Sequence, residues 1–203
     1  MKTTPQVAKI MQFKKPSRTV RNKDVRTREH LSEKEVLKLA KAVRQGTRYP
    51  DRNECLILMM FKHGLRASEV IKVRWDQIDF SAGLFHVNRL KGSIDTSHPL
   101  TGDVLRLLRR LERQDNRQRY VFVNERGSPI GYQAVYSMIR RIEEEAGFDF
   151  PIHPHMLRHS CGFYLANKGT DTRTIQHYMG HAHISNTVRY THLDANRFKA
   201  LWD

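Results

Sequence analysis

Hydrophobic residues recur at helical spacing along most of the chain. A first helix is predicted from Ser32 to Gly46, because Ser32 and Glu35 form a capping-box pattern ahead of apolar residues three and four positions apart. A second helix follows Asp51 and stops at Gly64. Its residues are apolar on nearly every side, which is typical of a helix in the centre of a core.

The hydrophobic period changes in the middle of the chain. Leu84 to Leu90 and Ile94 to Leu100 alternate as strands do, and they flank Lys91-Gly92, which predicts a hairpin. Val121 to Val123 is a candidate short strand. The sheet is therefore expected to be small and antiparallel.

Helical spacing returns on both sides of this sheet. Further helices are predicted at 67–73, 101–114, 133–146, 154–167, 172–179 and 186–192, with one more turn or two at 196–202. The predicted fold class is mainly α with a small antiparallel β-sheet, an α+β domain. Cys55 and Cys161 fall in predicted helices, so we expect buried, inert thiols and a reducing, cytoplasmic setting.

The net charge of the chain indicates the kind of partner it binds. The 203 residues include 36 Lys or Arg and 21 Asp or Glu, a formal net charge of +15. A charge of this size indicates a polyanionic partner. The chain contains no apolar run long enough to cross a membrane and no secretory signal pattern, so a membrane partner is not expected.

The positive charge is concentrated at the N-terminus. Residues 1–30 hold nine Lys or Arg against two acidic residues, a net charge of +7, with few apolar residues and no clear period. We interpret them as a flexible basic arm that contacts DNA phosphates, although a leader without a role is the alternative. The expected contacts are Lys14, Lys15, Arg18, Arg21 and Lys23.

Six scattered polar side chains together suit phosphodiester chemistry without a metal. They are Arg66, Lys91, His155, Arg158, His181 and Tyr190. Guanidinium groups bind the non-bridging oxygens of a phosphate and stabilise the charge of its transition state. A tyrosine hydroxyl can attack phosphorus if a neighbouring base takes its proton or if nearby positive charge lowers its pKa.

Taken singly, each of these residues has an ordinary interpretation. Arg66 would be a surface arginine, Lys91 a turn lysine and Tyr190 a half-buried aromatic residue. Their joint order favours a catalytic site. Arg89 is a weaker competitor to Lys91, and together with His159 and His192 it is a candidate DNA contact.

Three separated motifs resemble those of the tyrosine recombinases, the phage integrase family. They are Gly64-Leu65-Arg66-Ala67-Ser68-Glu69, His155-Met156-Leu157-Arg158-His159, and Gly180-His181 followed by Tyr190-Thr191-His192. The resemblance runs from about residue 31 to the end. The stretch from Ile152 to Phe163 is similar, more narrowly, to the recombinases that invert a fimbrial promoter switch.

The resemblance implies a role for each motif residue. Arg66 and Arg158 would hold the scissile phosphate, and Glu69 would orient the first arginine. The proton of the tyrosine would pass to His155, and His181 would hydrogen-bond a non-bridging oxygen. Lys91 would protonate the leaving 5′-oxygen, and Tyr190 would form a 3′-phosphotyrosyl bond without ATP, metal or other cofactor.

The resemblance also implies organisation and partners. Residues 31–203 would form the catalytic domain, with no separate N-terminal core-binding domain. The expected partner is double-stranded DNA with short repeats, bound in the nucleoid by a homotetramer, with accessory DNA-bending proteins. The expected outcome is inversion of a DNA segment that carries a fimbrial promoter.

Two other classes of function stay open from the residues alone. One is a metal-dependent nickase, for which the chain offers five histidines: His153, His155, His159, His181 and His183. The other is a DNA-binding transcriptional regulator without catalysis, which the charge alone permits. A type IB topoisomerase would use similar chemistry, but relaxing supercoils needs one subunit whereas recombination needs four.

Overall fold

The computed structural model describes residues 28–89, 95–114 and 118–191. Within them lie nine regular elements of helix and three short strands, in the order α2 (Glu33–Gly46), α3 (Pro50–Lys62), α4 (Ala67–Val70), η1 (Trp75–Gln77), β1 (Ile78–Asp79), β2 (Leu84–Val87), β3 (Thr96–Pro99), α5 (Gly102–Gln114), α6 (Tyr132–Glu145), α7 (Pro154–Asn167), α8 (Thr172–Met179) and α9 (Ser185–Val188). The predicted class, mostly helical with one small antiparallel sheet, is confirmed.

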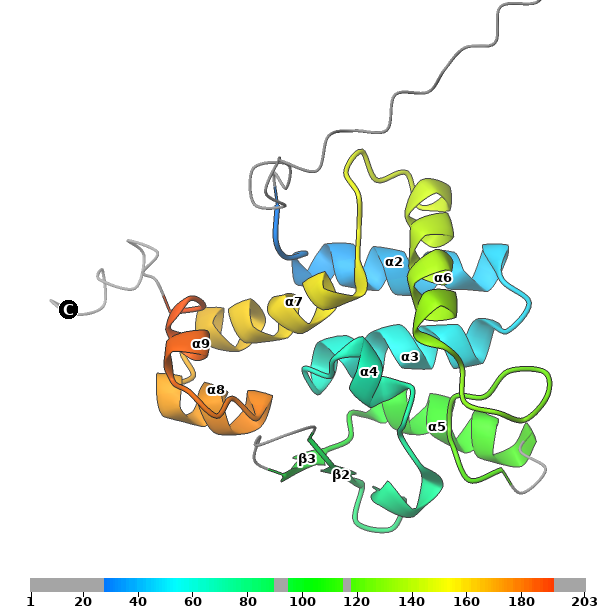
Figure 1. The fold of residues 1–203 in the computed structure, drawn as a ribbon, viewed down its shortest axis with the longest axis horizontal. Coiled ribbons are helices and arrows are strands. Elements are labelled where there is room, and N and C mark those ends of the chain that lie inside the picture. The colour runs from blue at the N-terminus through cyan, green and yellow to red at the C-terminus, as the bar shows by residue number, and fades with distance from the viewer. Residues whose placement is uncertain (1–27, 90–94, 115–117, 192–203) are drawn as a thin grey trace, which may run out of the picture.

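Helix α3 is the centre of the core, as its pattern predicts. Every side chain from Cys55 to Phe61 is buried, and α3 contacts α2, α5 and α7. Figure 1 shows α2 and α6 on one side of α3, with α5 and the sheet on the other. Both predicted buried cysteines are in fact buried, and burial raises the pKa of the Cys161 thiol to about 12.

Local signals set several helix ends where they were predicted. Ser32 and Glu35 make both hydrogen bonds of the capping box that begins α2. Gly64 takes a positive φ of 59° just after α3, and a side chain there would lie 2.5 Å from the Met179 sulfur. Glycine therefore allows the chain to turn into α4 while α8 packs closely against the turn.

The two hairpin strands are shorter than predicted, and the sheet has an additional strand, β1, that was not predicted. Strands β1, β2 and β3 form one antiparallel sheet in that order, with Phe85 opposite both Ile78 and His98. The predicted strand Val121–Val123 makes only an isolated bridge from Val123 to Pro129. The connection between β2 and β3 includes Lys91 and lies largely outside the described residues.

The last helices differ in how well their ends were predicted. Helices α7 and α8 have the predicted bounds, but α9 ends at Val188 rather than at residue 192. The predicted turn at 196–202 lies outside the described residues.

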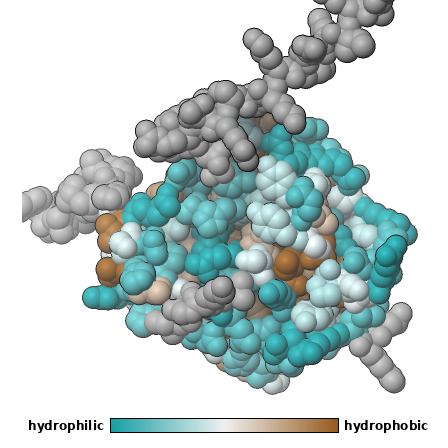
Figure 2. Space-filling view, viewed as in Figure 1, coloured by the Kyte–Doolittle hydropathy of each residue, from teal (hydrophilic) through white to brown (hydrophobic). Residues whose placement is uncertain are grey.

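No helix in the described part of the chain is long and apolar enough to cross a membrane. Figure 2 shows a mostly hydrophilic face with small apolar areas.

Candidate active site

A single carboxylate gathers three arginines from three parts of the chain. The Glu69 side chain is 1% exposed, and its oxygens lie 2.7 Å from Arg66, 3.2 Å from Arg89 and 3.7 Å from Arg158. Burial raises the pKa of the Glu69 carboxyl, but the Arg66 backbone hydrogen bond and the arginine charges outweigh this and hold the pKa below its ordinary value. The carboxylate is therefore ionised at neutral pH.

Arg66 is held at the start of α4 by the same glutamate. Its backbone N–H donates to Glu69 at 2.8 Å and its guanidinium donates to the other carboxylate oxygen. The Arg66 side chain remains 35% exposed. The exposed part of the guanidinium can therefore reach a ligand while the Arg66 backbone is held in place.

Arg158 occupies the middle of α7 with its guanidinium buried. It donates hydrogen bonds to the carbonyls of Gly64 and Met179, the latter at 2.7 Å. Burial, and then the charges of Arg66 and Arg89, lower its pKa to about 10, so it stays charged at pH 7. The turn after α3 and the end of α8 thus fix this arginine beside Arg66.

Arg89 does not lie where a DNA contact requires it, and that expectation is wrong. Its side chain is 0% exposed, pairs with Glu69, and donates to the backbone carbonyls of His63 and Tyr178 at 3.1 and 2.7 Å. A guanidinium enclosed in this way joins β2 to α3 and α8. Phe85, Val87 and Arg89 alternate along one strand face, so the inward direction was readable from the strand period.

The contacts of the two histidines of α7 differ from those expected. His159, expected at DNA, is buried and its Nδ1 lies 2.9 Å from the Tyr190 hydroxyl. His155, expected to take the tyrosine proton, is exposed and contacts the His159 ring edge-on at 4.3 Å. Desolvation by the surrounding side chains, and then the charges of neighbouring arginines and histidines, lowers the pKa of His155 to about 4 and that of His159 to about 3. Both are neutral at pH 7.

His181 comes to the same place from the turn after α8. It is buried, and its Nδ1 shares a 2.8 Å hydrogen bond with the hydroxyl of Thr187, a fully buried residue that the motifs did not single out. Its ring stacks against Tyr190 with 6.0 Å between centroids. Burial, and then Arg158, lower the pKa of His181 to about 3.

Tyr190 is more enclosed than its expected role suggests. It is only 4% exposed, with Phe163 edge-on at 5.2 Å between ring centroids. A side chain at Gly162 would lie 2.5 Å from the tyrosine ring, so α7 approaches it as closely as glycine allows. Burial raises the pKa of the Tyr190 phenol. The phenol is therefore largely shielded from solvent in this arrangement.

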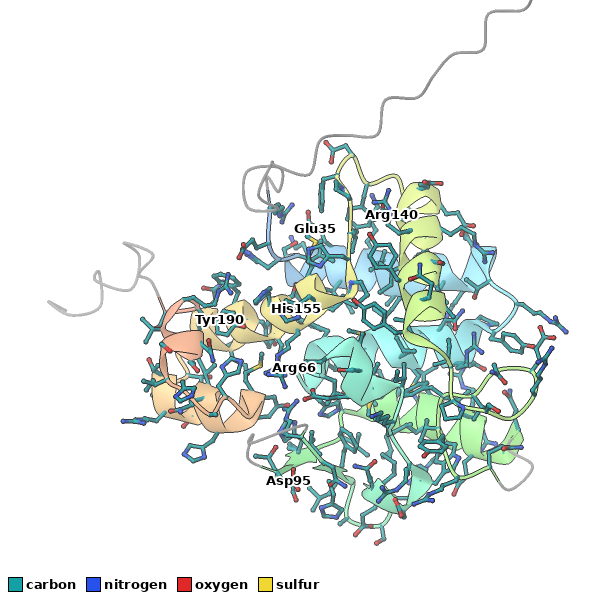
Figure 3. All side chains as sticks on the ribbon, viewed as in Figure 1. Glu35, Arg66, Asp95, Arg140, His155 and Tyr190 are labelled. Carbon is teal, nitrogen blue, oxygen red and sulfur yellow. The ribbon has the colours of Figure 1, made fainter. Side chains whose placement is uncertain are left out.

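Figure 3 shows Arg66, His155 and Tyr190 near α7, between α4 on one side and α9 on the other. In this arrangement the Arg66 charge lowers the pKa values of His155, His181 and Tyr190, although burial is the largest influence on each. The structure thus brings together five of the six predicted catalytic residues. The sixth, Lys91, lies outside the described residues, as do Lys14, Lys15, Arg18, Arg21, Lys23 and His192.

The sequence of this chain matches a known family over most of its length. Residues 29–197 match the Phage integrase family. The chain belongs to this family, the tyrosine recombinases. It is 41% identical over 185 residues to the type 1 fimbriae regulatory protein FimB of Escherichia coli K12, covering 89% of this chain and 92% of FimB. It is 40% identical to FimE of the same strain, covering 87% and 91%.

Solved tyrosine recombinases share the fold. The crystal structure of XerA recombinase matches with a TM-score of 0.72 and 25% identity, over 85% of this chain and 63% of XerA. XerH site-specific recombinase bound to its difH substrate also matches with 0.72 and 25%, over 86% of this chain and 53% of XerH. The chain therefore spans between half and two thirds of these solved recombinases.

In this recombinase two of the five candidate metal-binding histidines have side-chain hydrogen bonds within the protein. His159 bonds Tyr190 and His181 bonds Thr187. Across residues 28–89, 95–114 and 118–191, no group of three or more His, Cys, Asp or Glu side chains is placed to hold a metal ion. Two site residues escaped the motif search, Gly162 and Thr187. A glycine inside a helix costs about 1 kcal/mol, so its presence in α7 was a usable signal of close packing.

Proposed function

We propose that this tyrosine recombinase performs site-specific DNA inversion through a covalent bond from Tyr190 to DNA. One observation carries the proposal: Glu69 holds Arg66 and Arg158 together, close enough for both arginine charges to act on the buried phenol. Two guanidinium groups beside a potential nucleophile suit a phosphodiester and its transition state.

In the proposed reaction, Arg66 and Arg158 bind the non-bridging oxygens of the scissile phosphate. The Tyr190 oxygen attacks phosphorus, the bond from phosphorus to the 5′-oxygen breaks, and a 3′-phosphotyrosyl bond forms. Lys91 donates the proton that the leaving 5′-oxygen needs. The phosphotyrosyl bond conserves the energy of the phosphodiester, so a 5′-hydroxyl from another strand attacks it and restores DNA without ATP.

The tyrosine proton goes to His159 in this proposal rather than to His155. His159 is the group hydrogen-bonded to the phenol, at 2.9 Å. His155 instead contacts the ring of His159. The low pKa of His159, caused first by its burial, makes it a weak base in the free protein. A bound phosphate brings negative charge, which raises the pKa of a nearby histidine and improves it as a proton acceptor.

The fimbrial part of the proposal comes from the relatives. FimB and FimE are each matched over about nine tenths of both chains. We therefore propose that the DNA is a promoter-bearing segment between short inverted repeats, and that inversion turns expression of fimbriae on or off. The acting form is a tetramer on synapsed DNA in the cytoplasm, aided by DNA-bending proteins, and residues 1–30 supply sequence-independent phosphate contacts.

Covalent capture tests the chemistry. The protein is mixed with a pool of nicked duplexes, so that the short strand released by cleavage diffuses away and the adduct accumulates. Denaturing electrophoresis isolates the adduct, and mass mapping is expected to locate DNA on Tyr190 through a 3′-phosphate. A Tyr190→Phe variant should retain DNA binding and give no adduct.

The same assay separates the alternatives. A regulator without catalysis gives no adduct with the wild-type protein. A metal-dependent nickase loses cleavage in EDTA, whereas the proposed reaction does not. Sequencing of captured DNA supplies the recognition site, and two inverted copies on a plasmid then report inversion directly. An adduct on another residue, or at a 5′-phosphate, would overturn the mechanism.

A further inference from the structure

The segment that precedes α2 contacts Arg189 and Phe163, which are neighbours of the tyrosine that α7 and α9 enclose. We call residues 28–31 the strap. Glu29 forms an ion pair with Arg189, the residue immediately before Tyr190, although the two are 160 positions apart in sequence. The strap therefore joins the N-terminal end of the described chain to the backbone that carries the phenol.

A stack of rings makes a second connection. The His30 ring lies on the ring of Phe163 with 3.9 Å between centroids and a small interplanar angle of 24°. Phe163 in turn contacts Tyr190 edge-on at 5.2 Å. Phe163 thus sits between the strap and the tyrosine, and a displacement of His30 removes the support on the outer side of Phe163.

The strap is anchored at both ends, and its middle residues make more exposed contacts. At one end the Arg28 guanidinium donates two hydrogen bonds to the Glu35 carboxylate, at 2.7 and 2.6 Å. Leu31 is buried, and its backbone N–H donates to the buried Ser160 hydroxyl at 2.8 Å. By contrast, the side chains of Glu29 and Arg189 are 48% and 45% exposed. A cavity of about 370 Å³ lies between the strap and α7, lined in part by His30 and Phe163. The contacts of Glu29 and His30 therefore lie outside the buried core, between the anchored residues Arg28 and Leu31.

We propose that the strap is a restraint on the nucleophile: Glu29 and His30 hold Tyr190 in its enclosed position, and displacement of the strap frees the phenol to reach DNA. Glu29, His30 and Phe163 are then positioning residues, since none of them touches the reacting atoms. This proposal rests on the proposed function of Tyr190. It gives the recombinase a means of withholding cleavage until the strap moves.

Nitration of tyrosine tests the restraint without DNA. Tetranitromethane modifies accessible phenols, and mass spectrometry reads the Tyr190 peptide, with the 54%-exposed Tyr132 as an internal standard. Glu29→Gln removes the ion pair and should raise the nitration rate of Tyr190 about two- to fivefold, because exposed pairs are weak. His30→Leu removes the ring stack and should raise it about two- to tenfold.

Glu33→Gln is the matched control. It removes the same charge four residues further along, from an exposed side chain for which the described residues show no ion pair. It should leave the nitration of Tyr190 unchanged. A rise in Glu29→Gln that is no larger than in Glu33→Gln, together with no rise in His30→Leu, would overturn the restraint.

The rate of adduct formation with saturating nicked duplex provides the second readout. Release of the strap should accelerate covalent capture by the same factors, while a slower or unchanged rate contradicts the proposal. The two proposals fail differently. If Tyr190 is not the nucleophile, no variant forms an adduct on Tyr190, yet the nitration result still reports on the strap. If only the restraint is wrong, wild type and strap variants react at the same rate.

Discussion

Gly162 offers a quantitative test of where the Tyr190 ring lies. A β-carbon built on Gly162 would lie 2.5, 2.6 and 2.7 Å from three carbons of that ring, well inside the roughly 3.5–4.0 Å of a normal carbon contact. Gly162 is also in the middle of α7, where alanine is intrinsically better than glycine by about 1 kcal/mol. The substitution Gly162→Ala therefore sets two opposed effects against each other.

Overpacking a closely packed site costs about 1–3 kcal/mol, which exceeds the gain in helix propensity. We expect Gly162→Ala to lower the free energy of unfolding by up to about 2 kcal/mol, with a matching increase in Tyr190 nitration as the ring moves out. Urea unfolding followed by circular dichroism measures the first effect. The two readouts together distinguish ring displacement from a general loosening of the core.

A double-mutant cycle isolates the contact. In a Tyr190→Ala background the obstructing ring is absent, so Gly162→Ala should instead stabilise the protein by about 1 kcal/mol. In a Tyr190→Phe background the ring remains, and the destabilisation should persist. If Gly162→Ala stabilises the otherwise unchanged chain by the full difference in helix propensity, Tyr190 does not pack on α7 as described.

Three further outcomes are expected. Glu69→Gln should destabilise the protein by about 3–5 kcal/mol in urea, because it leaves the buried Arg158 and Arg89 without their counter-charge; a destabilisation below about 1 kcal/mol would contradict the pairing. Burial lowers the pKa of His63 to about 3, below its unfolded value, so folding stability is retained above about pH 6.5 and lost as the pH falls toward 3. At pH 5 this histidine should account for ~2 kcal/mol of that decrease. The substitution His63→Leu should therefore flatten the profile of melting temperature against pH between pH 7 and 5. An unchanged slope would show that other groups dominate. Removing residues 1–27 should reduce the slope of log affinity against log salt by about 0.9 for each phosphate that these residues neutralise, as measured by fluorescence anisotropy, and an unaltered slope would exclude them from DNA binding.

The sequence predicted those elements whose ends carry their own chemistry. Pro154 suits the first turn of α7, and Gly180 adopts a left-handed conformation at the end of α8, so both helices have the predicted bounds. The sheet was harder to predict. Strand β1 has two residues, too few for an alternating pattern, and its pairing with β2 is a tertiary contact.

Within the site, the order of motifs in the sequence predicted which residues lie close together, but not which side chains form hydrogen bonds with one another. His155 and His159 are one turn apart on the same helix, so no local signal decides which of them bonds the phenol. That choice depends on where the segment after α9 places Tyr190. Arg89 is the converse case. Its inward position follows from strand alternation, whereas its place in the hairpin beside Lys91 had suggested a DNA contact.

The glutamate with its three arginines has a consequence for the energetics of the reaction. Arg66, Arg89 and Arg158 together with Glu69 carry a formal charge of +2, and the nearby His155 and His181 are neutral at pH 7. An intact phosphodiester bears one negative charge, whereas the pentacoordinate phosphorane formed when a phenolate attacks it bears two. The positive charge of this cluster therefore matches in magnitude the negative charge of the proposed transition state and exceeds that of the substrate, so the electrostatic stabilisation would grow as the proposed reaction proceeds.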